Sequence, residues 1–179
     1  MPHNVDLLKS ALKRHRGLSK SNQYLVCLPD IPGSTLSGAD RDILCKATKV
    51  PGIQNMSHNR AIGMEIEKVA WGYAVQDMDL TFHVTQDQKI REYFALWSRL
   101  AVDHNANTIG YKKDYQKEIK ILTKYYDTEI IGSRAWSSEI ILEDSFPTTI
   151  NAIELNNEID GLMDLNVQIS YTKWRTRYK

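Results

Sequence analysis

The segment from Ala74 to Ala101 changes its hydrophobic period once, from two residues to three or four. Its first half alternates apolar and polar side chains, which predicts a strand with one buried face. The apolar positions of this strand are Met78, Leu80, Phe82 and Val84. Its second half predicts an amphipathic helix over residues 87–102. The apolar stripe of the helix is Ile90, Tyr93, Phe94, Trp97, Leu100 and Ala101. Because both elements need an apolar cover, we expect the helix to pack on a sheet built around this strand.

Composition narrows the class of protein. A chain of 179 residues with 42% hydrophobic content is predicted to form one domain, residues 1–179, around a substantial core. The 23 basic and 22 acidic residues are nearly balanced, which argues against a surface devoted to nucleic acid or to an anionic membrane. Cys27 and Cys45 show no CxxC spacing, so we expect free, half-buried thiols in a reducing compartment. No signal peptide or membrane-spanning run is recognised, which predicts a soluble protein without a membrane anchor.

The first third of the chain predicts a helical segment followed by two strands. Residues 1–17 form the N-terminal helical segment, with a narrow apolar stripe and a basic end that favours the helix dipole. Residues 22–28 contain the apolar run Tyr24 to Leu28, which predicts a strand buried on both faces. Residues 29–42 contain Pro29, Pro32, Gly33 and Gly38, so we expect a long loop, interpreted as a local insertion. A second strand is predicted over residues 43–50.

Residues 51–73 are more apolar than a solvated hairpin should be. We interpret them as strands that extend beyond the core to contact another chain, because exposed apolar segments with polar rims are usually contact surfaces. An irregular core hairpin explains the same pattern equally well. The candidate residues for this contact with another chain are Met56, Ile62, Met64, Ile66, Val69, Trp71 and Tyr73.

Three further strands are predicted over residues 115–123, 136–142 and 164–172, with a turn at residues 124–127. Residues 144–150 are expected to be a connector, because Pro147 cannot donate to a central ladder. The basic tail at residues 173–179 is interpreted as a surface edge, with phosphate contact as the alternative. The fold class is mainly β: an antiparallel β-sandwich or partly closed barrel of six or seven strands, with one capping helix and a short N-terminal helix.

The sequence contains no recognisable catalytic, cofactor or metal motif. The five histidines are scattered and none has the spacing of a zinc site on a helix. Asp77 and Asp79 lie two apart on one strand face and could form an acid/base pair, but two solvated acids are the simpler interpretation. We therefore predict that the protein is not an enzyme and has no cofactor.

Several short segments, taken in order, resemble tail tube proteins of contractile-tailed bacteriophages. The first are Leu18-Ser19-Lys20-Ser21-Asn22-Gln23-Tyr24 and Leu44-Cys45-Lys46-Ala47-Thr48-Lys49-Val50-Pro51-Gly52. Asn59-Arg60 precedes a hairpin, and Asp79-Leu80-Thr81-Phe82 precedes a helix with Phe94-Ala95-Leu96-Trp97. The last are Phe146-Pro147-Thr148-Thr149-Ile150, Val167-Gln168-Ile169-Ser170-Tyr171 and Trp174. The resemblance covers residues 18–174.

The resemblance implies a structural virion protein whose copies close into hexameric rings. In this family the rings stack into a hollow tube that conducts DNA during ejection, and the type VI secretion tube protein shares the design. The implied partners are further copies of the chain, the tail sheath, the baseplate and the tail terminator, with transient passage of DNA and assembly in the host bacterial cytoplasm. Asp77 and Asp79 become candidates for the lumen wall, where acids repel phosphate. A tube-initiator or baseplate protein of the same fold, or a non-viral ligand-binding β-sandwich, remains an alternative.

Overall fold

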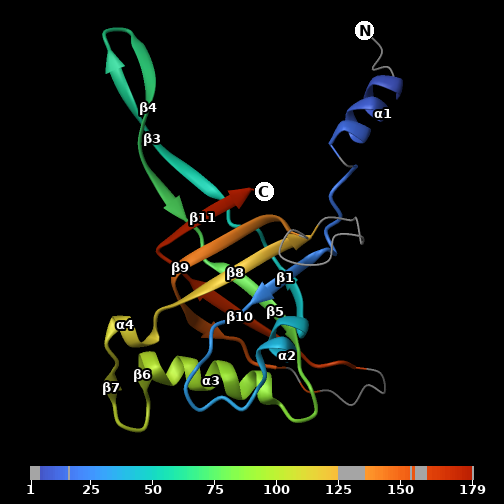
Figure 1. Ribbon diagram of the computed structural model, residues 1–179. Helices are drawn as coiled ribbons and strands as arrows, with labels where there is room; N and C mark the ends of the chain where they lie inside the picture. The colour runs from blue at the N-terminus through green and yellow to red at the C-terminus, as the bar shows by residue number, and fades with distance from the viewer. Residues whose placement is uncertain (1–4, 16, 125–135, 154, 156–160, 179) are drawn as a thin grey trace.

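The fold is built on an antiparallel sheet path that bends into two layers (Figure 1). The computed structural model describes residues 5–15, 17–124, 136–153, 155 and 161–178. The seven strands are, in spatial order, β1 (Tyr24–Cys27), β8 (Lys117–Lys124), β9 (Trp136–Ile150), β10 (Asp164–Ser170), β5 (Met78–His83) and β2 (Cys45–Thr48), with β11 (Lys173–Tyr178) beside β9. The path is open at β1 and β2. The predicted mainly β, antiparallel sandwich is confirmed, and the barrel is not closed.

Strand β9 belongs to both layers. Its first half pairs with β8 on one side and β11 on the other, and its second half pairs with β10. The prediction that Pro147 excludes a central strand was wrong: Pro147 lies within β9, opposite Ile169. The register shifts between Gln168 and Ile169, and such irregularities are where a sheet tolerates proline. The predicted surface edge at the C-terminus is strand β11.

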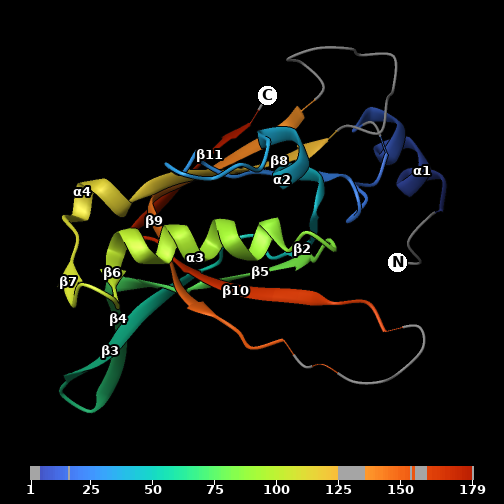
Figure 2. The ribbon, with the colours of Figure 1, turned by 90° about the horizontal axis from the view of Figure 1, so that it is seen from below.

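Helix α3 (Lys89–Ala101) covers the end of the two layers: it lies below the strands in Figure 1 and runs across the space between the layers in the view of Figure 2. Its buried aromatic side chains form the centre of the core: the Phe94 ring lies 5.0 Å from Phe82 on β5 and 5.1 Å from Tyr93. Trp97 is fully buried, and its indole nitrogen donates to the Tyr115 carbonyl oxygen at 2.7 Å. The core from the strands includes Val26, Leu80, Ile119, Ile121, Ile140, Leu142, Leu165, Val167 and Ile169. The predicted capping helix is confirmed.

The strand predicted from Ala74 starts later. Ala74 and Val75 end strand β4, and β5 begins at Met78. From there burial alternates as predicted, with Met78, Leu80 and Phe82 inside. A period-2 pattern cannot locate a turn between two strands when the residues on both sides keep the alternation.

The loop predicted over residues 29–42 contains more structure than expected. Its end forms helix α2 (Gly38–Ile43), which begins after the N-cap Ser37. Arg41 of this helix is buried, stacks 5.2 Å from the Tyr93 ring centre and donates to the Pro29 carbonyl oxygen at 2.9 Å. A six-residue helix is too short to show a hydrophobic period, so the sequence pattern could not reveal it.

Helix α1 (Val5–Arg14) has no buried residues and stands away from the strands (Figure 1). Of the predicted N-terminal segment, residues 1–4 and 16 lie outside the described residues. So do residues 125–127 of the predicted turn. Short elements β6 (Val102–Asp103), β7 (Thr108–Ile109) and α4 (Lys112–Tyr115) follow α3 at the end of the molecule opposite the longest hairpin.

Candidate assembly surfaces

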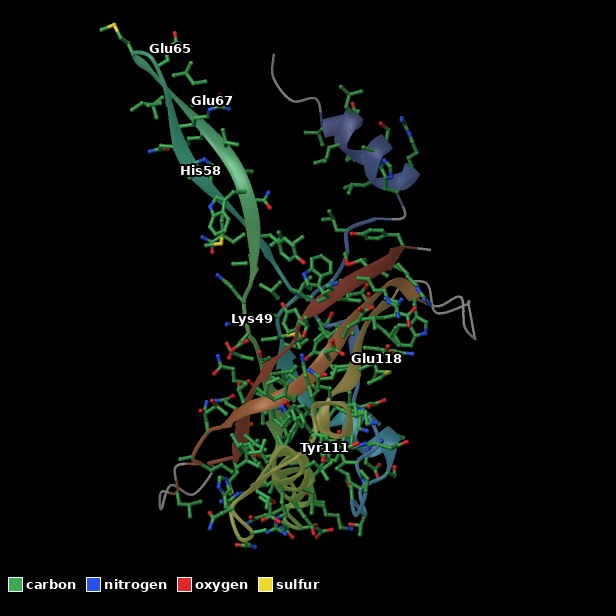
Figure 3. All side chains as sticks on the ribbon, turned by 90° about the vertical axis from the view of Figure 1, so that its left-hand side faces the viewer. Lys49, His58, Glu65, Glu67, Tyr111 and Glu118 are labelled. Carbon is green, nitrogen blue, oxygen red and sulfur yellow. The ribbon has the colours of Figure 1, made fainter. Side chains whose placement is uncertain are left out.

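A long two-stranded hairpin projects from the body (Figures 1 and 3). It consists of β3 (Ile53–Ile62) and β4 (Glu65–Val75), and every residue of β3 has a partner on β4. The turn contains Gly63 at a positive φ of 63°, which glycine adopts without steric cost. Ten residues of extended chain span roughly 30 Å. The hairpin therefore reaches far beyond the two layers.

All seven predicted contact residues lie on this hairpin, and all but the half-buried Val69 are exposed. Residues paired across an antiparallel ladder share a face. The pairing therefore places Met56, Ile62 and Val69 on one face and Ile66 and Tyr73 on the other. Trp71 falls at the register shift, and Met64 is in the turn. The alternative of an irregular core hairpin is wrong, because the core cluster includes no hairpin residue beyond Val75 at the base.

This geometry leaves the hairpin short of stabilising contacts. An isolated two-stranded hairpin is marginally stable in water, and each of its strands has a free backbone edge. Trp71 and Tyr73 are 63% and 58% exposed, which is unusual for large aromatic side chains. The hairpin is thus suited to burial against another surface.

The polar face around β5 mixes both signs of charge. Asp79 is exposed on β5, as predicted, but its carboxylate pairs with the Lys49 ammonium at 3.0 Å. Thr81 beside it donates to the Asn166 side chain at 2.7 Å. Asp77 is exposed in the connection between β4 and β5. The structure therefore does not bring the two acids together as an isolated pair, and Lys49 offsets one of them.

A second charged cluster on this face joins three strands. Asp164 on β10 accepts from the Lys46 ammonium and lies 3.0 Å from the His83 Nδ1 atom. The bond from Lys46, aided by His83, holds the pKa of the Asp164 carboxyl below its ordinary 3.8. Sequence reasoning missed this cluster, because its members are 37 to 118 positions apart and only the strand register brings them together.

The two cysteines do not form a reactive site. Both thiols are free and half-buried, as predicted. Burial, with help from the nearby Asp42 carboxylate, raises the pKa of Cys27 to about 11. Burial raises the pKa of Cys45 to about 12. Since the thiolate is the nucleophile, both side chains are poor nucleophiles at neutral pH.

Neither a metal site nor a membrane-spanning helix is found among the residues that the structure describes. No group of three or more His, Cys, Asp or Glu side chains there is arranged to hold a metal ion. Among the same residues, no helix is long and apolar enough to cross a membrane.

The basic C-terminal strand is largely neutralised by its neighbours. Arg175 pairs with Glu143 at 3.1 Å, and Arg177 lies 3.8 Å from Glu139, both across the ladder to β9. Opposite charges in cross-strand positions stabilise the pairing of strands. The arginines of this tail are therefore explained by sheet pairing.

Known structures share this arrangement of strands and helix. The anti-feeding prophage tube-terminating cap aligns with a TM-score of 0.64 at 10% identity, covering 90% of this chain and 92% of the other. The sheath–tube complex of an extracellular contractile injection system, PVC, gives 0.63 at 10% identity, covering 95% and 97%. The anti-feeding prophage baseplate gives 0.62 at 11% identity, covering 90% and 97%. The fold is thus that of subunits from contractile injection systems.

A family model gives the identification. The model described as phage tail tube protein matches residues 19–177, so the chain belongs to the phage tail tube protein family. No curated protein matches it. The resemblance found in the sequence is confirmed, and the protein is a structural component of a tail.

Proposed function

We propose that this protein is the repeating subunit of a phage tail tube, closing into hexameric rings that stack into a hollow channel for DNA during ejection. The observation that carries the proposal is the β3–β4 hairpin, which exposes both of its faces and both of its edges far from the core. A subunit that repeats along an axis needs two unlike contact surfaces, because a contact between unlike surfaces generates an open, growing assembly, and the hairpin supplies one of them.

The proposed partners follow from that role. Further copies of the chain form the ring and the stack, and the sheath, the baseplate and the terminator contact the outside and the two ends of the tube. DNA passes without specific binding, which requires that the lumen wall hold no large excess of positive charge. Asp77 and Asp79 are proposed for that wall, where Asp79 balances Lys49. Assembly takes place in the host cytoplasm, and the protein has no enzymatic role.

A second candidate is a tube-initiating, capping or baseplate subunit. The specific reason to keep it is that cap, sheath–tube and baseplate structures match this fold almost equally, at TM-scores of 0.62 to 0.64. Such a subunit forms one ring and stops, whereas a tube subunit continues to add rings.

Electron microscopy of the purified protein tests both candidates. Six-fold rings that grow into tubes as the concentration rises support the tube subunit. Six-fold rings that never stack favour the initiator or cap. A protein that stays monomeric at every concentration overturns both and revives a ligand-binding β-sandwich.

A further inference from the structure

The end of the molecule opposite the hairpin carries a second exposed apolar surface. It is formed by the β6–β7 pair and the three residues that follow Gly110, here called the knob (residues 102–113). Ile109 and Tyr111 are 83% and 80% exposed, and Val102, the strand partner of Ile109, is 42% exposed. None of these three side chains belongs to the hydrophobic core, so core packing does not explain why they are apolar.

The knob is fixed rigidly to helix α3. The Gly110 amide donates to the Ala101 carbonyl oxygen at 3.0 Å. A Cβ atom at position 110 would lie 2.1 Å from the Leu100 carbonyl oxygen, so only glycine permits this close approach. The knob is therefore presented at a defined position at the end of the helix.

The hairpin tip and the knob lie at opposite ends of the body and on the same side of it. Figure 3 places Glu65 and Glu67 at one end and Tyr111 toward the other. In the view along that direction, the hairpin and the β6–β7 pair project to the same side (Figure 2). A copy displaced along this axis thus presents its knob to the tip of the first.

The two surfaces are complementary in charge and in polarity. The tip carries the exposed acids Glu65 and Glu67 beside Met64, which is fully exposed. The knob carries exposed Lys112 and Lys113 next to Tyr111. The match is local, because Arg60 lies opposite Glu67 in the hairpin ladder, Asp103 belongs to the knob and Asp114 follows Lys113. The acids next to Met64 and the lysines next to Tyr111 are nevertheless of opposite sign beside an apolar centre, which gives a contact between them its orientation.

We propose that the hairpin tip of one copy docks on the knob of a copy in the next ring, with Glu65 and Glu67 facing Lys112 and Lys113. This contact rests on the proposed tube function, and it identifies the knob as the surface that receives the hairpin of the neighbouring ring. Because the tip and the knob differ, the contact is head-to-tail and repeats without limit along the tube axis.

Charge reversal in the full chain tests the contact. The tip variant carries Glu65→Lys and Glu67→Lys, the knob variant carries Lys112→Glu and Lys113→Glu, and the combined variant carries all four. Each reversal alone should weaken stacking by about tenfold or more per contact and leave rings without tubes. The combined variant should regain tube growth, because attraction is restored with the signs exchanged. Arg91→Glu with Glu92→Lys, on the exposed face of α3, is the matched control and should not change tube length.

The outcomes separate this contact from the function on which it rests. If the wild type forms tubes but the knob variant grows them equally well, or the combined variant fails to recover, the knob is not the acceptor and the tube function stands. If the wild type forms neither rings nor tubes, the tube function and this contact both fall.

A cysteine pair provides an independent measurement. The double variant Met64→Cys with Ile109→Cys should still form tubes. Mild oxidation of these tubes should link each copy to the next one along the axis and give a ladder of covalent oligomers. The half-buried Cys27 and Cys45 are present in every variant, and each single variant controls for them. A covalent dimer from Met64→Cys alone, absent from Ile109→Cys and from the wild type, would mean that tips meet tips and would overturn the contact. If intact tubes of the double variant gave no ladder, the proposed contact would also be overturned.

Discussion

The Tyr24 hydroxyl donates a hydrogen bond to the Lys46 carbonyl oxygen at 2.6 Å, which joins β1 to β2, the two end strands of the sheet path. A second, longer contact of 3.4 Å reaches the Cys45 carbonyl oxygen. One side chain thus spans the gap that keeps the seven strands from closing into a barrel. This side chain bridges β1 and β2 without a ladder of backbone hydrogen bonds between them.

Replacing this tyrosine should loosen the gap. Tyr24→Phe keeps the ring but removes the hydroxyl, and we expect a loss of about 0.5–1.5 kcal/mol in the free energy of unfolding. Urea unfolding of the unassembled chain measures the loss. Tyr178→Phe on the exposed end of β11 is the control and should be neutral. Equal stability of the two variants would mean that the Tyr24 bond contributes nothing.

The sequence pattern located the core well, because period and burial are directly linked. Leu80 and Phe82 from the strand and Phe94 and Trp97 from the helix are all fully buried, as the alternation and the helical stripe predicted. These positions depend on local geometry. A residue two positions along a strand, or three or four positions along a helix, lies on the same face whatever the rest of the fold does.

Long-range pairing was not predictable in the same way. Pro147 lies in a central strand because a register irregularity opposite it removes the need for its missing donor. The bond between Asp164 and Lys46 depends on β10 and β2 both flanking β5, which no local pattern encodes. For the candidate assembly surfaces, the excess of apolar residues in the hairpin did predict a contact with another chain. No sequence pattern predicted the knob as a contact surface, because Ile109 and Tyr111 are isolated apolar residues in a loop-rich stretch.

Two tryptophans should separate folding from assembly. Trp97 is fully buried, so Trp97→Ala should cost about 3–5 kcal/mol of unfolding free energy through a cavity and an unpaired Tyr115 carbonyl. Trp71 on the hairpin is 63% exposed, so Trp71→Ala should change the stability of the unassembled chain by less than about 0.5 kcal/mol. The same Trp71 variant should weaken tube growth in electron micrographs. Normal tubes from it would argue against burial of this side chain in the assembly.

Charged residues on the hairpin should block stacking without unfolding the body. Ile66→Lys on one face or Val69→Asp on the other places a charge where the proposed contact excludes water. We expect six-fold rings of normal appearance that no longer form tubes. Circular dichroism checks that the chain remains folded. Tubes of normal length from both variants would show that the hairpin does not mediate contact between rings.

The close approach at Gly110 should be intolerant of any side chain. Gly110→Ala forces its Cβ atom against the Leu100 carbonyl oxygen, and we expect a cost of about 1–3 kcal/mol as the knob moves away from α3. Gly52→Ala is the matched control, because no atom lies within 4 Å of the Cβ position there. Thermal unfolding compares the two. A neutral Gly110→Ala would mean that the knob shifts without resistance and is not held rigidly.

The Asp164 cluster should make part of the stability depend on pH. The folded-state pKa of Asp164 lies below 3.8, so the folded chain binds this proton less readily than the unfolded chain does. The contribution is therefore fully present well above pH 3.8 and is lost as the pH falls through the folded-state pKa. Asp164→Asn should be less stable than the wild type by up to about 1 kcal/mol at pH 7, as expected for a surface pair. That difference should vanish in strong acid. Urea titrations of both chains from pH 7 downward measure it, and a difference that is constant across this range would exclude Asp164 ionisation as its cause.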